Sequence, residues 1–327
     1  MTIREVAQQA GVSTAAVSRY FNHGSLSEDK KERIRKTVER TGYQPSAAGK
    51  MLRTGRINQI GVIVSRISSE AVGELTDGVA GKLDGSSYMV MLGNCNEDEK
   101  AALRYLALMQ KNHVAGIILM GMTYNAAFEK AFRECSVPLV VTGQDFPEVN
   151  CVCYDDFGAA RDLAAEMIAR GHRKIGYIGV TEKDPAVGIE RKKGVRRAMD
   201  DAGLDGKKMP AVIGQFTRES GAGGVMKLIA MDPGIDGIIC ATDSIALGAM
   251  EKLKSLGRAV PADTAVAGFG DHWSDTITDP PLTSVHLYHK RCGEEAAEMI
   301  LDIIANGQGE DRRLIRLGYE IAERKSL

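Results

Sequence analysis

The stretch TIREVAQQAGVSTAAVSRYFN, residues 2–22, has the pattern of two short helices joined by a tight turn. Thr2 is a suitable N-cap for the first helix, and Glu5, three residues later, completes a capping box. Gly11 is placed to end that helix, and Ser13 to cap the start of the second. We therefore predict a helix-turn-helix over these residues.

The two faces of the second helix differ in chemistry. Ala16, Val17 and Tyr20 recur at helical spacing, so we expect them to pack on the first helix. The opposite face carries small, hydroxyl and cationic side chains, namely Thr14, Ala15, Ser18 and Arg19. Such a face suits the major groove of DNA. The alternative is a small helical pair exposed to solvent, because short patterns of this kind also occur by chance.

A third helix is predicted after Ser27, with Ile34 and Val38 as its apolar stripe and Gly42 at its end. Residues 1–45 then form a minimal three-helix bundle. Residues 1–57 hold 11 Lys or Arg against 5 Asp or Glu, whereas the other 270 residues hold 31 basic and 38 acidic groups. This asymmetry predicts a polyanionic partner for the N-terminal module alone.

Residues 46–57 are predicted to be a linker. They contain SAAGKMLRTGR, a short helical pattern that Gly49 interrupts. Isolated helices of this length are marginal in water, and a central glycine costs about 1 kcal/mol relative to alanine. We expect a hinge helix here only when other groups hold it.

From residue 58 onward, short apolar runs alternate with amphipathic segments. The predicted strands are 60–64, 88–92, 116–120, 138–143, 175–180, 237–243 and 264–270, and the predicted helices are 97–112, 157–170, 188–202, 218–230 and 244–256. Alternation of this kind indicates an α/β fold with parallel sheets that are covered on both faces. So many strands in 270 residues fit two doubly wound units better than one.

Polar and aromatic side chains follow these strands, at the edge where doubly wound sheets bind their ligands. The candidates for a binding site are Arg66, Glu70, Gln144, Tyr154, Phe216, Thr242, Asp271 and Trp273. Hydrogen-bonding groups beside flat apolar surfaces suit a polyhydroxylated ligand. Each candidate also has a structural alternative: Asp184 and Asp243 could be simple N-caps, Tyr154 and Phe216 core residues, and Arg66 the ion-pair partner of Glu70 or Asp271.

Other classes of function lack their sequence signals. There is no GxSxG, GxxxxGK[ST] or HExxH motif, and no GxGxxG between a strand and a helix. The six cysteines show no metal-ligand spacing, so we expect buried thiols, no metal and no cofactor. His272 beside Asp271 is interpreted as a structural or ligand-contacting pair. No run of 18 apolar residues occurs and the start is polar, which predicts a cytosolic protein without membrane association.

Taken together, these segments resemble the LacI family of transcriptional repressors. The matching stretches are TIREVAQQAGVSTAAVSRYFN, LSEDKKERIRKTVERTGYQPSAAGKMLR, CATDSIALGAM and DPPLTSVHLYHKRCGEEAAEMIL. The resemblance implies a homodimer or tetramer that binds a pseudo-palindromic operator. It also implies a periplasmic-binding-protein-like core at 58–327 that closes around a small effector. An N-subdomain would comprise about 58–155 plus 286–318, and a C-subdomain about 156–285.

The resemblance also assigns roles to individual residues. Thr14, Ala15 and Arg19 match base-reading positions, Ser13 and Ser18 match phosphate contacts, Asn22 and Ser46 join the DNA-contacting set, and Leu52 matches a minor-groove wedge. In the core, Arg191 and Thr242 match effector contacts and Phe216 an aromatic platform. Two positions depart from the family pattern. Ala15 replaces a longer reading side chain, and Gly270 replaces a sugar-binding aspartate, so Asp271 becomes the nearer candidate.

Among subfamilies, SRISSE, TGQD, CYDDFGAARDL and CATDSIALG are most similar to sucrose-operon repressors, with trehalose-6-phosphate repressors next. The second group has an arginine near the position of Gln144, and phosphates are usually bound by arginine. We therefore expect a repressor, not an enzyme, that responds to sucrose or a related uncharged disaccharide. The alternatives are a sugar phosphate, control by a partner protein or nucleobase, and a sugar-binding protein or enzyme with a helical appendage.

Overall fold

The computed structural model describes residues 1–21, 24–43 and 57–327. The chain divides into two compact units, which we describe separately: residues 1–58 with 112–114, and residues 59–111 with 115–327. The predictions for Asn22, Ser46, Leu52 and the linker segment 46–56 lie outside the described residues. No helix in the described ranges has the length and apolar character that a membrane crossing needs.

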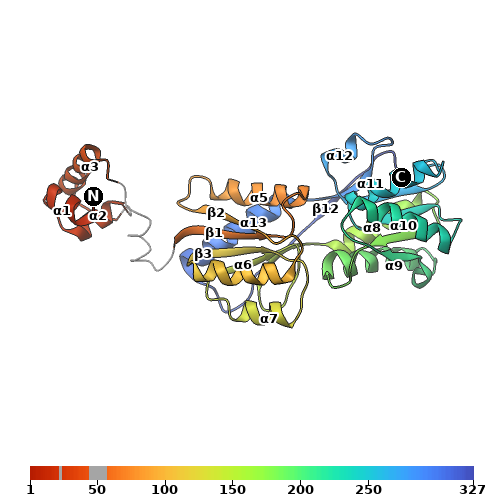
Figure 1. Cartoon of the computed structure of the whole chain (residues 1–327), viewed down its shortest axis with the longest axis horizontal. Helices are drawn as coiled ribbons and strands as arrows, with labels where there is room; N and C mark the ends of the chain where they lie inside the picture. The colour runs from red at the N-terminus through yellow and green to blue at the C-terminus, as the bar shows by residue number, and fades with distance from the viewer. Residues whose placement is uncertain (22–23, 44–56) are drawn as a thin grey trace. The chain divides into compact units, whose positions relative to one another are not determined.

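The first unit contains the three predicted helices, α1 (Ile3–Ala10), α2 (Thr14–Phe21) and α3 (Glu28–Thr41) (Figure 1). The predicted capping box is present, because the Thr2 amide donates to Glu5 Oε2 at 2.7 Å and the Glu5 amide to Thr2 Oγ1 at 3.3 Å. Gly11 follows α1 in the left-handed conformation, with φ of 62°. Local sequence therefore determines where these helices begin and end.

A small apolar core orients α2. Its buried members come from all three helices: Val6, Ala7, Ala10, Ala16, Val17 and Ile34. Arg33 of α3 adds a polar contact by donating from Nε and Nη2 to Ala10 O, at 3.0 and 2.9 Å. A guanidinium at the carboxyl end of α1 satisfies a carbonyl that the helix leaves free. Helix α2 thus has one face buried and the other exposed.

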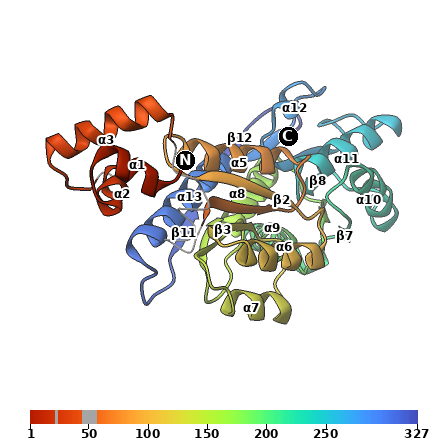
Figure 2. The same ribbon diagram turned by 60° about the vertical axis from the view of Figure 1, so that its left-hand side comes forward.

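The second unit is built on two six-stranded sheets, which confirms the predicted α/β class (Figures 1 and 2). The first has the order β11-β5-β4-β3-β1-β2, with strands Leu314–Leu317, Asn150–Tyr154, Leu139–Thr142, Val114–Met120, Ile57–Val64 and Met89–Asn94. The second has the order β12-β10-β9-β8-β6-β7, with strands Tyr319–Ala322, Thr283–Leu287, Ala265–Gly270, Gly237–Cys240, Ile175–Gly179 and Ala211–Ile213. Strand β12 pairs antiparallel with β10, whereas β6, β7, β8, β9 and β10 pair in parallel.

Helices pack on the sheets in pairs (Figure 1). In the first sheet, α5 (Glu70–Leu83) contacts α13 (His289–Asn306), and α6 (Glu99–Lys111) contacts α7 (Ala126–Arg133). In the second sheet, α8 (Asp156–Ala169) contacts α9 (Arg191–Asp201), and α10 (Arg218–Met231) contacts α11 (Asp243–Ser255). A short helix, α12 (Trp273–Thr276), follows β9. All seven predicted strands and all five predicted helices of this unit lie on observed elements of the same type.

The chain passes between the two sheets three times. These crossings follow β5, β10 and β11, so the last strand, β12, belongs to the second sheet and not to the first. The subdomain ranges expected from sequence left residues 319–327 unassigned. Short strands such as β7 and β12 carry little periodic signal, because three or four residues span fewer than two alternations.

Glycines allow three of the helix pairs to approach closely. A Cβ on Gly221 of α10 would lie 2.0 Å from Ile245 O, and one on Gly78 of α5 would lie 2.0 Å from Lys290 O. A Cβ on Gly194 of α9 would lie 2.3 Å from Phe157 O. Backbone carbonyls cannot move aside as a flexible side chain can, so each of these positions requires hydrogen in place of a methyl group.

Two glycines of α10 provide a matched test of this packing. Gly221→Ala should lower the free energy of unfolding by about 1–3 kcal/mol, because the added methyl overpacks the contact with α11. Gly223 has open space at the same Cβ position, so Gly223→Ala should be neutral or raise stability by up to about 1 kcal/mol. Urea unfolding of both variants measures the difference, and equal effects would show that close approach to α11 is not the constraint.

Candidate functional site

The predicted DNA-facing side chains lie on the open face of α2. Thr14, Ala15 and Arg19 are exposed, while Ser18 is partly buried. Ser13 is exposed and its Oγ accepts from the Ala16 amide at 3.2 Å, so this residue also serves as the predicted N-cap. Hydroxyls and a guanidinium on one side of a short helix are groups that donate to phosphates and base edges.

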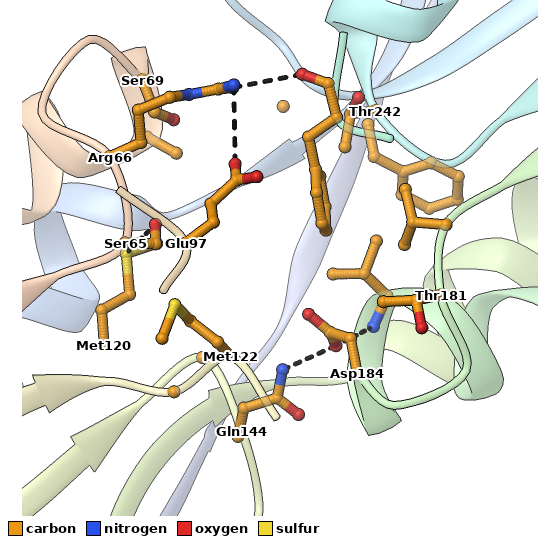
Figure 3. Close-up of a pocket in the computed structure, with 18 of the residues that line it drawn as sticks. Ser65, Arg66, Ser69, Glu97, Met120, Met122, Gln144, Thr181, Asp184 and Thr242 are labelled. Carbon is orange, nitrogen blue, oxygen red and sulfur yellow. Dashed lines mark hydrogen bonds and ion pairs between the residues drawn. The ribbon is translucent and has the colours of Figure 1, made fainter. Parts of the chain in front are cut away.

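A cavity of about 490 Å³ lies in the second unit, lined by residues from both sheets (Figure 3). Six of the nine predicted effector residues line it: Arg66, Gln144, Tyr154, Arg191, Phe216 and Thr242. They follow strand ends or begin helices, because the carboxyl ends of parallel strands meet at one edge of each sheet. Met120, Met122 and Phe269 add apolar surface to its walls.

Arg191 is buried at the start of α9. Its Nε donates to Asp156 Oδ1 at 2.7 Å, its Nη1 donates to Ala241 O at 2.6 Å, and the guanidinium lies over the Phe269 ring at 4.6 Å. Both charged side chains of this pair are nearly inaccessible to solvent, at 6% and 4% exposed. The ion-pair partner of Arg191 is thus Asp156, and not Asp184 or Glu190, which lie nearer in sequence. The π-helix Pro185–Glu190 directs Arg191 inward to Asp156 instead.

Gln144, at the end of β4, contacts residues of the second sheet's half of the unit. Its Nε2 donates to Asp184 Oδ1 at 2.7 Å, and its Oε1 accepts from the Ala186 amide at 3.1 Å (Figure 3). Burial raises the pKa of the Asp184 carboxyl to about 6, although donors from Gln144 and from the Val187 amide favour the ionised form. Asp184 is thus an N-cap, as one interpretation held, and also a cavity residue.

Arg66 lies on the opposite wall of the cavity in Figure 3. Its Nη2 donates to Phe216 O at 3.1 Å, and its Nη1 lies 3.5 Å from Glu97 Oε1. The partners considered from sequence, Glu70 and Asp271, are wrong. Asp271 lies elsewhere, and Glu97 occupies the position beside Arg66, because the Glu97 amide donates to Ser65 O at 2.8 Å.

His289 is a cavity residue that we did not predict from sequence. It begins α13, and its Nδ1 lies 2.8 Å from the hydroxyl of Tyr154. Burial, followed by the electrostatic effect of neighbouring His272 and Arg191, lowers the pKa of His289 to about 3, so the ring is neutral. A neutral imidazole can both donate and accept. The sequence signal was weak, because 135 residues separate the two partners.

Three predicted residues, Glu70, Asp271 and Trp273, do not line the cavity. Asp271 forms an ion pair with Arg324 and a hydrogen bond with His286, whose Nδ1 lies 3.0 Å from Oδ2. The Trp273 side chain is 67% exposed, and its amide donates to Glu70 Oε1 at 3.1 Å. Asp271 and Trp273 follow β9, where the chain turns at Asp271 with φ of 57°.

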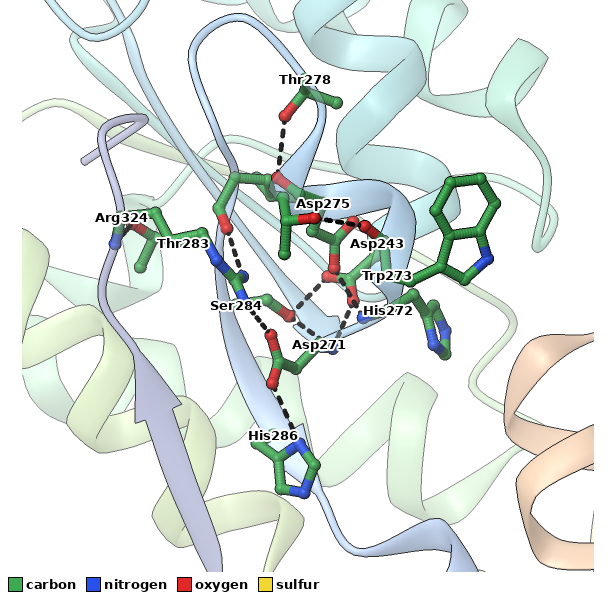
Figure 4. Close-up of polar contacts among 12 residues, drawn as sticks. Asp243, Asp271, His272, Trp273, Asp275, Thr278, Thr283, Ser284, His286 and Arg324 are labelled. Atoms are coloured by element: carbon green, nitrogen blue, oxygen red, sulfur yellow. Dashed lines mark hydrogen bonds and ion pairs between the residues drawn. The ribbon is translucent and has the colours of Figure 1, made fainter. Parts of the chain in front are cut away.

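Gly270 stands where the family pattern has a sugar-binding aspartate. The position of Asp243 explains why a glycine is needed there. A Cβ on Gly270 would lie 2.6 Å from Asp243 Oδ2, so the buried Asp243 carboxylate occupies the space that a side chain would need. Asp243 accepts from the Asp271 amide at 2.6 Å and from Ser284 Oγ at 2.7 Å (Figure 4). Burial, and then the negative charge of Asp243, raises the pKa of neighbouring Asp275 to about 8. The two carboxyls therefore retain a proton between them at neutral pH.

The comparisons with known proteins cover the whole chain. Residues 2–46 match the model of bacterial regulatory proteins, lacI family, and residues 164–327 match the periplasmic binding protein-like domain. The sucrose operon repressor of Staphylococcus xylosus is 29% identical over 315 residues, which cover 96% of this chain and 97% of the relative. The transcriptional regulator CelR of Thermobifida fusca is 30% identical over 326 residues, covering 96% and 95%. The solved CelR–cellobiose complex aligns with a TM-score of 0.77 at 26% identity, covering 100% of this chain and 99% of the other.

Asp156→Asn tests how strongly the cavity depends on its buried ion pair. Removing the carboxylate leaves the Arg191 charge buried without a counter-charge, so the free energy of unfolding should fall by about 3–5 kcal/mol. Urea unfolding measures the loss.

Two further variants test whether the loss of stability comes from the unpaired buried charge. Asp156→Leu combined with Arg191→Met replaces the pair by apolar groups and should recover most of the stability. Glu129→Gln removes the carboxylate of an exposed pair with Arg133 and should cost less than about 1 kcal/mol. A loss in Asp156→Asn no larger than that of Glu129→Gln would contradict the prediction.

Proposed function

The chain belongs to the LacI family of bacterial regulatory proteins, and we propose that it is a repressor whose affinity for operator DNA is controlled by an uncharged sugar, sucrose or a related disaccharide. The observation that supports an uncharged effector is that both arginines of the cavity are paired with carboxylates. Arg191 is paired with Asp156, and Arg66 with Glu97. Paired guanidiniums orient hydroxyl groups without offering an uncompensated positive charge to an anion.

The DNA-binding half of the proposal rests on α2. Its exposed Thr14, Ala15 and Arg19 are the base-reading candidates, and Ser13 and Ser18 the phosphate contacts. A LacI-family repressor acts as a symmetric oligomer, so we propose a homodimer whose two copies of α2 bind the halves of a pseudo-palindromic operator. The linker 46–57, with Leu52 as a minor-groove wedge, completes this interface in the proposal.

The shape of the cavity supports a sugar. Phe216, Phe269 and Tyr154 supply flat surfaces, while Gln144, Asp184 and Thr242 supply edge hydrogen bonds. Sugar rings present an apolar face and a polar edge, which suits this combination. Because the walls come from both sheets, a bound sugar would favour one arrangement of the two halves over others. Such a preference couples effector binding to operator binding. The coupling free energy is typically about 1–3 kcal/mol and can strengthen or weaken operator binding.

A sugar phosphate is the second candidate effector. Lys183 is exposed and lines the cavity rim, and an ammonium there would suit a phosphate ester. Gln144 is the group that argues for the neutral sugar, because its amide is already engaged with Asp184 and carries no charge.

Arg19→Ala should weaken binding to the specific operator by about 1–3 kcal/mol, the loss expected for a bidentate base contact. Lys36→Ala removes an exposed cation of α3 that lies 3.6 Å from Glu32, and it should have a smaller effect. Mobility-shift titrations at one salt concentration compare the two variants. Unchanged specific binding in Arg19→Ala would mean that α2 does not read the operator.

Sugar affinity should increase as the pH rises through about 6 and then level off, because a sugar hydroxyl donates best to ionised Asp184. The sign follows from the bound state: a hydrogen bond to the carboxylate lowers its pKa in the complex, so the sugar binds more tightly once the free carboxyl has ionised. Calorimetric titration of the full chain with sucrose and cellobiose between about pH 5 and 7 measures this.

The matched control is Asp184→Asn, which should bind more weakly and lose the pH dependence. Sucrose 6-phosphate and trehalose 6-phosphate form the second arm of the experiment. Tight binding of either ester, with no measurable binding of the neutral sugars, would replace the proposed effector by a sugar phosphate.

A further inference from the structure

A group of metal-ligating side chains lies beside the cavity that we assign to the sugar, and one of its members, His272, also lines that cavity. It consists of Glu70 and Glu74 on α5 and His272 at the start of α12, and one donor atom from each residue lies within 4.8 Å of the other two. Glu70 and Glu74 are four residues apart, so they project from the same face of α5. His272 comes from the half of the unit built on the second sheet. The group therefore joins the two halves.

The polar contacts within this group do not engage every atom that could bind a metal ion. His272 Nδ1 is buried and has no hydrogen-bond partner among the described residues, although Glu70 Oε1 lies 3.7 Å away. Glu70 Oε1 is held in place by the Trp273 amide at 3.1 Å. In Figure 4 the His272 ring points away from the buried Asp243 and Asp275 carboxyls. An unsatisfied buried nitrogen is unfavourable unless a cation or donor completes the site.

Glu74 adds a second carboxylate with little compensation. It is partly buried, four residues after Glu70 on α5, and its carboxylate lies within 4.8 Å of the donor atoms of Glu70 and His272. Two carboxylates at this spacing on a helix repel one another. The arrangement is thus costly by itself and becomes favourable when a positive ion lies between the three side chains.

We propose that Glu70, Glu74 and His272 bind a divalent transition-metal ion of the Zn²⁺ type. An imidazole nitrogen with two carboxylates selects Zn²⁺, Co²⁺ or Ni²⁺ over Mg²⁺ and Ca²⁺, which prefer oxygen ligands alone. Bonds of about 2.0–2.2 Å bring tetrahedral ligands to about 3.4 Å from one another, so the side chains need to move inward by roughly 1 Å. Water would complete the coordination.

Metal binding at this point has a structural consequence. Because the ligands come from α5 and from the segment before α12, the ion would stabilise the arrangement in which the two halves are in contact. His272 also lines the sugar cavity, so metal and effector would bind next to each other and influence each other's affinity by linkage. The metal site itself does not depend on the identity of the effector.

Zn²⁺ and Co²⁺ titrations of the full chain, without sugar, test the proposal. Saturating Zn²⁺ should raise the melting temperature by several degrees, and Co²⁺ should give visible absorption without thiolate charge-transfer bands. Glu74→Gln and His272→Ala should each weaken the apparent metal affinity at least about tenfold, the loss that even an outer-shell partner can cause. The melting temperature without metal shows whether each variant is folded.

Asp77→Asn is the matched control. Asp77 lies on the same helix and pairs with Lys290 outside the group, so this variant should bind Zn²⁺ like the unmodified chain. Equal metal affinity in all four proteins would place the ion elsewhere, and no binding in the unmodified chain would mean that these three side chains do not form a metal site. Either result would overturn the proposal.

Discussion

Asp156 accepts a hydrogen bond from Arg191 at 2.7 Å, just after the chain first passes from one sheet to the other. The same guanidinium donates to Ala241 at the end of β8 and lies over Phe269 of β9. One buried cation thereby holds two helix starts and two strand ends in register. The walls of the cavity on the second sheet depend on this contact, because moving either charge would leave the other buried without compensation.

Charge compensation recurs around the cavity. Arg66 is paired with Glu97, Asp184 accepts from Gln144, and His289 is neutral beside Tyr154. The arginines are balanced by carboxylates and His289 is neutral, while Asp184 can accept from a ligand hydroxyl once it has ionised. This pattern is what a binding site for a neutral, hydroxylated molecule requires, because each polar group is oriented before the ligand arrives.

The halves of the second unit meet through side chains on either side of the cavity. Gln144 contacts Asp184 and the Ala186 amide, Arg66 contacts Phe216 O, and Glu70 contacts the Trp273 amide. Three chain crossings also connect the halves. A ligand or ion that binds among these contacts changes the relative stability of the arrangements that the two halves can adopt. Regulation of a LacI-family repressor requires more than one stable arrangement of the halves.

The sequence by itself determined the features that depend on neighbours a few residues away. The caps Thr2, Gly11 and Ser13, the buried strand runs and the polar residues that follow them were all predictable, because caps and periodicity act over one or two turns. Five of the six expected residues that line the cavity were predicted from strand ends, since parallel strands end at one edge, and the sixth, Arg191, was implied by the family resemblance. Tertiary structure alone decided the partners: Asp156 for Arg191, Glu97 for Arg66, Asp184 for Gln144 and His289 for Tyr154. It also decided that Asp271 faces Arg324 and that Gly270 leaves room for Asp243. The pairing of buried charges depends on which strand ends and helix starts come together in space, and on the volume left between them, neither of which local spacing encodes.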